Sequence, residues 1–469
     1  MMMTKDMTAG NPMKLIIHFA LPLLVGNLLQ QTYNLIDAAL VGRFLGTQAL
    51  ASVGASSSVQ FLVLGFCMGV CNGFAVPVAR DFGAGAIDRM RKCVFHAMAL
   101  AACIAVILTI ACAVLCPQIL HLLSTPEDIF DNAYLYLLII FLGIPFTILY
   151  NLLSCILRAV GDSRTPFMFL AFSATLNIFL DMLCIIVLKW GCAGAAIATI
   201  TAQAVSGSCC LVYMIKRFEI LRLRKTDCHF TASGAGEMLS MGVPMGLQFS
   251  ITAIGSMVMQ SANNGLGSVY VSGFTAGMRI KQFTMCPFDA IATAVSVFCS
   301  QNLGAAKVKR IYQGIKKGMV ISVIYGLAAG IVLIFAGRTL AMLFVGSEGA
   351  QAVQVLDAAA KYLRCMGFFY WSLGILNVCR MTTQGLGFSG RAVFSGVTEM
   401  IARIFVSFVF VSRYGYTAIC FADQTAWVSA CLYIVPTCLF CIHKIAKHLE
   451  TDKDFSESAN TEPMVEIKF

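Results

Sequence analysis

Residues 175–181, TLNIFLD, lie inside a long apolar run that extends from Phe167 to Leu188. Asn177 and Asp181 are four residues apart, so on a helix they share one face, one turn from each other. A charged Asp at the centre of a membrane helix costs about 2.5–3.5 kcal/mol on insertion scales. The carboxylate must therefore be paired, protonated or bound to an ion. Asp37, a second carboxylate within an apolar run, is the neighbour that we expect for it.

The composition predicts a membrane protein. The 469-residue chain has 59% hydrophobic and 12% charged residues, with a mean hydropathy of +0.82, whereas soluble domains carry about 25% charged residues. A net charge of +10 does not indicate a nucleic-acid partner here, because the basic residues occur in short clusters between apolar runs. We therefore expect a multi-pass protein of the plasma membrane (the inner membrane in a two-membrane cell), with the lipid bilayer as its partner and no nucleic acid.

The apolar runs predict an all-α membrane protein with twelve transmembrane helices. A helix needs about 20 apolar residues to cross the hydrocarbon core, and several runs are longer, so we expect tilt or extension beyond the bilayer. The expected spans are roughly 15–41, 50–78, 93–119, 133–157, 166–189, 193–215, 238–262, 270–302, 318–345, 358–383, 391–412 and 417–442.

The distribution of basic residues predicts the orientation. With the N-terminus inside, 24 of the 33 Lys and Arg residues fall in cytoplasmic segments. Cytoplasmic loops of membrane proteins carry such an excess. Both termini are therefore expected in the cytoplasm.

The chain also repeats itself, which predicts two six-helix bundles as a parallel internal repeat. We expect an N-lobe at 1–216, a cytoplasmic linker at 217–237, a C-lobe at 238–449 and a polar, disordered tail at 450–469. The matching pairs are Gly46 and Gly267 (221 apart), Gly83 and Gly304 (221), Pro22 and Pro244 (222), and Gly161 and Gly387 (226).

Two sets of spaced glycines predict close helix packing. Gly65, Gly69 and Gly73 form a double GxxxG pattern in the second span, and Gly326 and Gly330 form another in the ninth. Such small residues let helix backbones approach closely in a membrane.

The familiar enzyme motifs are absent. The sequence has no Walker A loop, no H-E-x-x-H, no G-x-S-x-G and no dinucleotide fingerprint, and its 20 Cys have no zinc spacing. We therefore expect neither an enzyme nor an ATP-driven pump, no cofactor, and no metal site apart from Na⁺ at the two Asp residues.

Four polar residues are predicted to meet in the outer half of the N-lobe: Asp37, Asn177, Asp181 and Thr199. Counting 1.5 Å per residue from the expected helix ends puts them at similar depths. Two carboxylates, an amide oxygen and a hydroxyl can bind Na⁺, and two close carboxylates can share a proton because like charges raise one pKa. Hydrogen bonding within the bundle would explain Asn177 and Thr199 taken singly, but we favour an ion site for the Asp pair.

Other residues within the spans are candidates of a different kind. Gln248, Asp289 and Glu399 are candidates for the lining of a substrate cavity. Glu399 lies four residues before Arg403, so an intrahelical ion pair is slightly favoured over a substrate contact. We expect Asp423 at the membrane interface, near the outer end of the last span.

The sequence resembles the multidrug and toxic compound extrusion (MATE) family over essentially all twelve spans. The resemblance rests on LP at 21–22, YNLIDAALVG at 33–42, LRAVGDSRTP at 157–166 and QNLGA at 301–305. It implies export by antiport against Na⁺ or H⁺. It also implies an N-lobe cation site at the positions matching Asp37, Asn177, Asp181 and Thr199, and a bend of the first helix at Pro22. The seventh span has no acidic residue, unlike branches of the family with a glutamate there, which puts a C-lobe cation site on that helix in doubt.

The function expected is therefore ion-coupled export of amphipathic, often cationic, organic compounds by a monomeric twelve-helix carrier with a cavity between its lobes. One alternative is a flippase for lipid-linked oligosaccharides, which would need a basic cleft. Another is a membrane protein that transports nothing. Between the two ions we favour H⁺, because the four residues supply few ligand oxygens for Na⁺.

Overall fold

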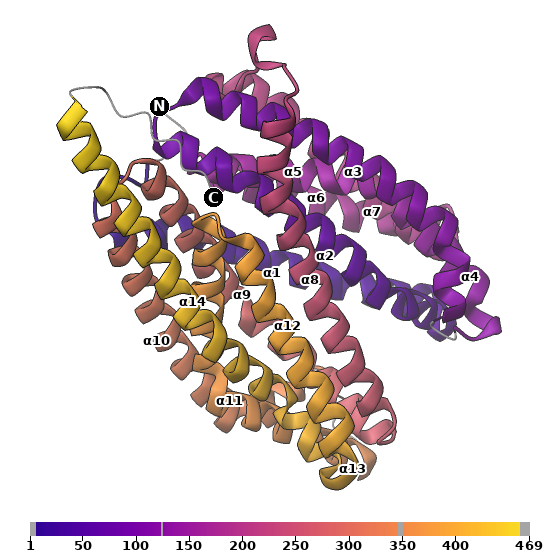
Figure 1. Ribbon diagram of the computed structural model, residues 1–469. Coiled ribbons are helices and arrows are strands. Elements are labelled where there is room, and N and C mark those ends of the chain that lie inside the picture. Colours follow the sequence, from indigo (N-terminus) through magenta and orange to yellow (C-terminus); the bar gives the residue numbers. More distant parts are fainter. Residues whose placement is uncertain (1–5, 123–124, 346–349, 460–469) are drawn as a thin grey trace. The chain divides into compact units, whose positions relative to one another are not determined.

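The computed structural model describes residues 6–122, 125–345 and 350–459, and within these ranges the chain is helical and contains no strand (Figure 1). The predicted all-α fold is confirmed. The longer helices are α1 (Pro12–Leu45), α2 (Thr47–Gly83), α3 (Ile87–Leu122), α4 (Glu127–Leu142), α5 (Ile144–Ala159), α6 (Arg164–Asp181), α7 (Gly191–Arg217), α8 (Ala232–Asn264), α9 (Ser268–Gly304), α10 (Val308–Ala341), α11 (Ala350–Gly385), α12 (Ser389–Phe405) and α14 (Tyr416–Ala459). The short elements are the π-helices η1 (Met182–Val187) and η4 (Val406–Phe410), the 3-10 helices η2 (Glu219–Leu221) and η3 (Lys225–Asp227), and α13 (Val411–Tyr414).

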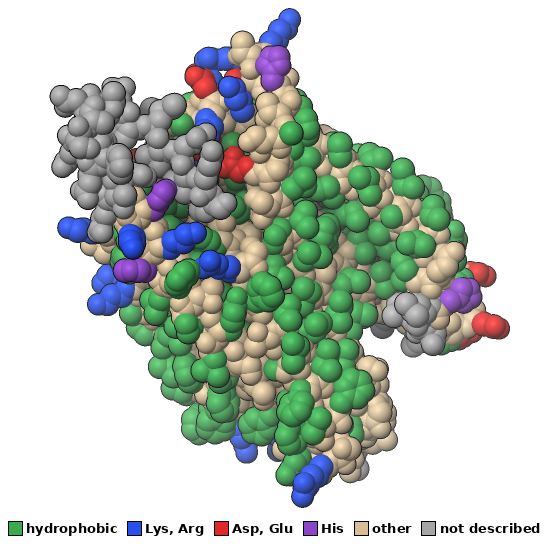
Figure 2. Space-filling view, viewed as in Figure 1, with side chains coloured by type: hydrophobic (Ala, Val, Ile, Leu, Met, Phe, Trp, Pro, Cys, Tyr) green, Lys and Arg blue, Asp and Glu red, His purple; other side chains and the backbone are tan. Residues whose placement is uncertain are grey.

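The helices match membrane spans in length and composition. Among the described residues, ten are long and apolar enough to cross a bilayer, and α4 with α5 forms an eleventh span bent by 46°. The remaining predicted span is α11, whose 36 residues include Asp357, Lys361 and Arg364 near its start. Hydrophobic side chains cover the middle parts of the helices in Figure 2, and Lys and Arg side chains lie near helix ends. This distribution is the one that a bilayer requires.

The helix boundaries differ from the expected spans in three places. The fourth span is divided at Gly143, because Pro145 cannot donate the backbone hydrogen bond that would continue the helix. The seventh begins at Ala232, inside the stretch predicted as a linker, and that stretch also contains η2 and η3. The segment predicted as a disordered polar tail is helical as far as Ala459, where α14 ends, and residues 460–469 lie outside the described ranges.

The internal repeat is visible in the elements themselves. Helices α2 and α9 each have 37 residues and follow glycines with positive φ, Gly46 (87°) and Gly267 (105°). Helix α6 continues into η1, and α12 continues into η4. A further pair with positive φ, Gly191 (60°) and Gly415 (54°), precedes the last span of each half. The two halves therefore contain the same local backbone features in the same order.

By contacts, the described chain forms two compact units. Unit 1 contains Leu21–Val78 and Ile87–Ala253, and unit 2 contains Asp6–Ala20, Ala79–Ala86 and the chain from Ile254 onward. Within unit 2, Met7 attaches the N-terminal segment to α9. Its N–H donates to Gln301 Oε1 (2.9 Å), and its carbonyl accepts from Asn302 Nδ2 (3.2 Å).

Both glycine patterns lie at close helix contacts, as predicted. In unit 1, a Cβ on Gly69 or Gly73 would collide with the backbone of α8, near Met245 and Gly242 respectively. In unit 2, Gly330 of α10 and Gly367 of α11 approach each other in the same way. The absence of side chains at these points lets the helices pack backbone to backbone.

Candidate functional site

Three helices of unit 1 bring the predicted ion-site residues together. Helix α1 carries Asp37, α6 carries Asn177 and Asp181 one turn apart, and α7 carries Thr199. The chain turns between α6 and α7 through η1 and Gly191, so that Thr199 returns alongside Asn177. Asp181 is fully buried, Asn177 is 3% exposed, and Asp37 is partly buried.

The amide of Asn177 links α6 to α7. In the orientation that satisfies its neighbours, its Nδ2 donates to Asp181 Oδ2 (3.3 Å) and its Oδ1 accepts from the backbone N–H of Thr199 (3.2 Å). In the opposite orientation Nδ2 lies 3.4 Å from Thr199 Oγ1, which itself donates to the Ala195 carbonyl (3.1 Å). In either orientation the amide bridges the two helices.

The carboxyl groups of Asp37 and Asp181 interact directly with each other. One oxygen of each, Oδ1, is buried and receives no hydrogen bond from the described residues. No Lys or Arg forms an ion pair with either carboxylate among the described residues. Two neighbouring carboxyl groups, one fully and one partly buried, that have no fixed counter-charge require a proton or a bound cation.

Two tyrosines that the sequence did not single out surround this pair. Tyr33 lies one turn before Asp37 on α1 and interacts electrostatically with both acids, as does Tyr136 of α4. Tyr33 hydrogen-bonds with Gln30, and Tyr136 with Gln60 of α2. The four-residue spacing of Tyr33 and Asp37 was a usable signal, whereas Tyr136 lies in a distant part of the sequence and gave none.

The oxygen atoms gathered here suit a proton or a hard monovalent cation. Carboxylate, amide, hydroxyl and phenol oxygens are all within one cluster, and hard cations prefer oxygen ligands. Among the described residues, no group of three or more His, Cys, Asp or Glu side chains forms a metal cluster. The oxygens of this cluster are thus ligands of the type that H⁺ or Na⁺ takes.

The candidate cavity residues lie on other helices, α8, α9 and α12. Gln248 lies on α8 in unit 1 and is 5% exposed. In unit 2, Asp289 of α9 is exposed and accepts a hydrogen bond from Asn377 Nδ2 of α11 (3.3 Å). Glu399 of α12 is buried and forms ion pairs with Arg403 (3.2 Å) and Arg380. The intrahelical pair between Glu399 and Arg403 is thus present, with a second Arg that the sequence pattern did not reveal.

A second buried cluster in unit 2 surrounds Asp423, about two turns into α14. Its carboxylate is fully buried and pairs with Lys281 Nζ (2.5 Å) and Arg403 Nε (3.1 Å). The Tyr362 hydroxyl also donates to it (2.8 Å), and Lys281 lies over the Trp427 ring (5.3 Å). We call Lys281, Tyr362, Arg380, Glu399, Arg403 and Asp423 the unit 2 ion network; it contains three cations and two anions.

A family model described as MatE matches residues 22–183 and 244–409, two stretches that begin 222 residues apart. The chain belongs to the MatE family. The predicted family membership and the internal repeat are therefore confirmed, and the chain is a membrane transporter of the multidrug efflux class rather than a member of an enzyme family.

The similarity to known proteins extends over most of the chain. It is 31% identical to the "Probable multidrug resistance protein YpnP" of Bacillus subtilis over 418 residues, which is 88% of this chain and 89% of that protein. It is 27% identical to YoeA of the same organism over 393 residues, 82% of this chain and 83% of the relative. A crystal structure described as MATE in complex with MaL6 has a TM-score of 0.88 at 21% identity, covering 94% of this chain and 99% of that one. At this identity, the structural likeness supports the fold.

Proposed function

We propose that this MatE transporter is an ion-coupled antiporter that exports amphipathic, often cationic, organic compounds across the plasma membrane. The observation that carries the proposal is the pair of Asp37 and Asp181 in unit 1, of which Asp181 is fully and Asp37 partly buried, with no Lys or Arg of the described residues paired to either. Uptake of an ion at this pair changes the charge of the membrane interior, and that change can drive a rearrangement of the helices that carry it. We further propose that Asn177 and Thr199 belong to the site and that both termini are cytoplasmic.

We favour H⁺ as the coupling ion. A proton needs one carboxylate, whereas Na⁺ needs several ligand oxygens, and the Asn177 amide already uses its oxygen and nitrogen within the protein. Both ions would compete for the same pair of carboxylates. Saturating Na⁺ should therefore weaken proton binding, and a low pH should weaken Na⁺ binding.

The test is dye efflux from proteoliposomes under two separate gradients. An imposed pH gradient without Na⁺ should drive efflux, and a Na⁺ gradient at constant pH should drive little. Efflux driven by Na⁺ alone, at a pH where both Asp residues are ionised, would reverse the preference for protons. Efflux under neither gradient would contradict ion coupling itself.

The unit 2 ion network argues against the flippase alternative. A flippase for a pyrophosphate-linked sugar needs accessible cations, but the buried cations Lys281, Arg380 and Arg403 all pair with Glu399 or Asp423. They are therefore engaged within the protein. Multidrug export remains the function that the site and the relatives both favour.

Pro22 is expected to affect turnover more than substrate binding. It lies inside α1, the helix that carries Asp37, and its ring removes a backbone hydrogen bond and permits a bend. Pro22→Ala should therefore slow transport while substrate affinity changes little, as measured by efflux rate and by equilibrium binding of a fluorescent substrate. Pro117→Ala in α3, a helix that carries none of the four ion-site residues, is the matched control. Equal effects of the two substitutions would mean that Pro22 serves packing only.

A further inference from the structure

The internal repeat relates several residues of the unit 1 ion site and its surroundings to residues of the unit 2 ion network. Helices α2 and α9 are both 37 residues long, and their constant offset of 221 puts Gln60 opposite Lys281. In the fourth span of each half, an offset of 226 puts Tyr136 opposite Tyr362, each followed by Leu. Tyr136, which interacts with the unit 1 acids, and Gln60, which hydrogen-bonds with Tyr136, thus have counterparts within the unit 2 network.

The remaining spans continue this correspondence. The same offset of 226 aligns Asn177-Ile178-Phe179 with Arg403-Ile404-Phe405 and puts Asp181 opposite Ser407. After the π-helices, Gly191 and Gly415 set the offset at 224, which puts Thr199 opposite Asp423.

The equivalent residues also touch one another in both halves. In unit 1, Gln60 contacts Tyr136, and Asn177 bridges to Asp181 and Thr199. In unit 2, Lys281, Tyr362 and Arg403 all contact the Asp423 carboxylate directly. The neutral Gln60 and Asn177 of the first half are thus replaced by two cations in the second.

We infer that unit 2 holds a copy of the cation site in which the ammonium of Lys281, assisted by Arg403, permanently takes the place of the mobile cation. The transporter then binds its coupling ion in unit 1 only. The inference rests on the proposed function of unit 1. In unit 2 the acid is already neutralised, so an added cation would meet repulsion where unit 1 offers attraction.

The experiment follows the unfolding temperature of the whole purified protein in detergent, as NaCl replaces choline chloride and as the pH is lowered. The wild type should be stabilised by Na⁺ or by protons, because a ligand that binds only the folded state raises its stability. Asp37→Asn/Asp181→Asn should lose that dependence. Lys281→Gln and Arg403→Asn give unit 2 the residues that unit 1 has at the equivalent positions, Gln60 and Asn177. Adding both substitutions to the double variant should restore the dependence on Na⁺ or pH, because Asp423 is then left without a counter-charge.

The outcomes distinguish a failure of the proposed unit 1 site from a failure of the inference about unit 2. A wild type that responds to neither ion contradicts the proposed unit 1 site. A full response in Asp37→Asn/Asp181→Asn overturns the inference, since unit 2 would then bind a mobile cation with Lys281 in place. No recovery after the unit 2 substitutions also overturns it. If the combined variant does not fold, Lys281→Gln alone can be added to Asp37→Asn/Asp181→Asn, and recovery of the ion response is measured in the same way.

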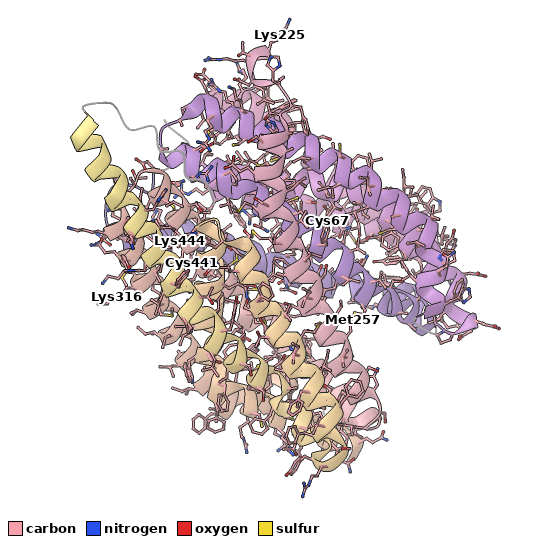
Figure 3. The ribbon with its side chains drawn as sticks, viewed as in Figure 1. Cys67, Lys225, Met257, Lys316, Cys441 and Lys444 are labelled. Atoms are coloured by element: carbon pink, nitrogen blue, oxygen red, sulfur yellow. The ribbon has the colours of Figure 1, made fainter. Side chains whose placement is uncertain are left out.

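An independent feature, a pocket at the end of α7, indicates a lipid site in unit 1. The pocket has a volume of about 420 Å³, and its walls include Phe169, Cys209, Val212 and Tyr213, with Lys216 and Arg217 at one end. Phe169 and Tyr213 pack edge to face at 5.6 Å. Residues 213–225 contain five basic residues and one acid, and Figure 3 shows Lys225 pointing away from the helices at the tip of this segment.

We propose that this pocket binds an anionic phospholipid. Its acyl chain would lie against Cys209 and Val212, which are exposed on the apolar face of α7, and its phosphate would contact Lys216 and Arg217. Basic pockets between membrane helices are suited to such headgroups. The bound lipid would hold α6 against α7, the two helices that carry Asn177, Asp181 and Thr199.

Native mass spectrometry of the whole protein can test this with phosphatidylglycerol and phosphatidylcholine of identical acyl chains. Lys216→Gln/Arg217→Gln should weaken phosphatidylglycerol binding about 30-fold, since each basic residue contributes about 1 kcal/mol and about 1.4 kcal/mol is tenfold. Cys209→Trp should fill the pocket and also reduce binding. Lys316→Gln/Lys317→Gln, the same charge change at exposed positions of α10, should have little effect. Equal losses in the two double variants, or none in the first, would overturn the proposal, as would displacement by soluble glycerol phosphate.

Discussion

Asp37→Asn and Asp181→Asn should each reduce gradient-driven efflux to the background level while leaving the folded protein at least as stable as the wild type. The two carboxyl groups interact in unit 1, and no Lys or Arg in the described part of the chain pairs with them. Converting one to an amide removes the group that takes up the ion, and it also removes repulsion between like charges. Loss of transport without loss of stability is the combination expected of a functional group that is costly to bury.

The measurement pairs dye efflux from proteoliposomes with thermal unfolding of the same preparations. Asp131→Asn is a matched control, because Asp131 is an exposed residue of α4 in the same unit. Its efflux and unfolding temperature should equal those of the wild type. Full efflux in either Asp37→Asn or Asp181→Asn would remove these residues from the coupling mechanism. A large drop in stability would assign them a structural role instead.

Asp423→Asn should have the opposite signature, with a loss of about 3–5 kcal/mol in the free energy of unfolding. Asp423 neutralises Lys281 and Arg403 at a fully buried position. Removing its charge leaves Lys281 buried without an anionic partner, and such a group is costly in a protein interior or a bilayer.

The control for Asp423→Asn is the same substitution in an ion pair at an exposed position. Arg338 and Asp357 are paired at 3.2 Å, but their side chains are 51% and 62% exposed. Asp357→Asn should therefore cost about 0–1 kcal/mol. Adding Lys281→Met to Asp423→Asn should recover part of the lost stability by removing the unpaired cation. Equal effects of Asp423→Asn and Asp357→Asn would mean that the network contributes no more than a surface pair.

The sequence predicted the components of the unit 1 site because each carries a local signal. Asn177 and Asp181 are one helical turn apart in an apolar run, and counting residues from the helix ends set their depth relative to Asp37. Tyr136 and Gln60 could not be placed in this way. Tyr136 reaches the acids through the packing of α4, and Gln60 of α2 contacts Tyr136. Neither residue is unusual in its own stretch of sequence.

The partners of Asp423 could not be predicted from the sequence for the same reason, because they come from other helices. Its position about two turns into α14 was predicted correctly, but depth along a helix does not reveal which side chains face a residue. Burial of Asp423 depends on Lys281 from α9 and Arg403 from α12, which lie 142 and 20 residues away in sequence. The break at Gly143, in contrast, had a visible local cause in Pro145.

The paired π-helices η1 and η4 bear on the history of the gene. A π turn holds one residue more than the α turn that it interrupts. One occurs in each half, within three residues after an aligned Ile-Phe pair and shortly before Gly191 or Gly415. A single insertion in an ancestral six-helix protein, followed by duplication, accounts for both; separate insertions would have to coincide. The two halves thus share a backbone irregularity at similar places, while the residues near it differ, with Asp181 in the first half and Ser407 in the second.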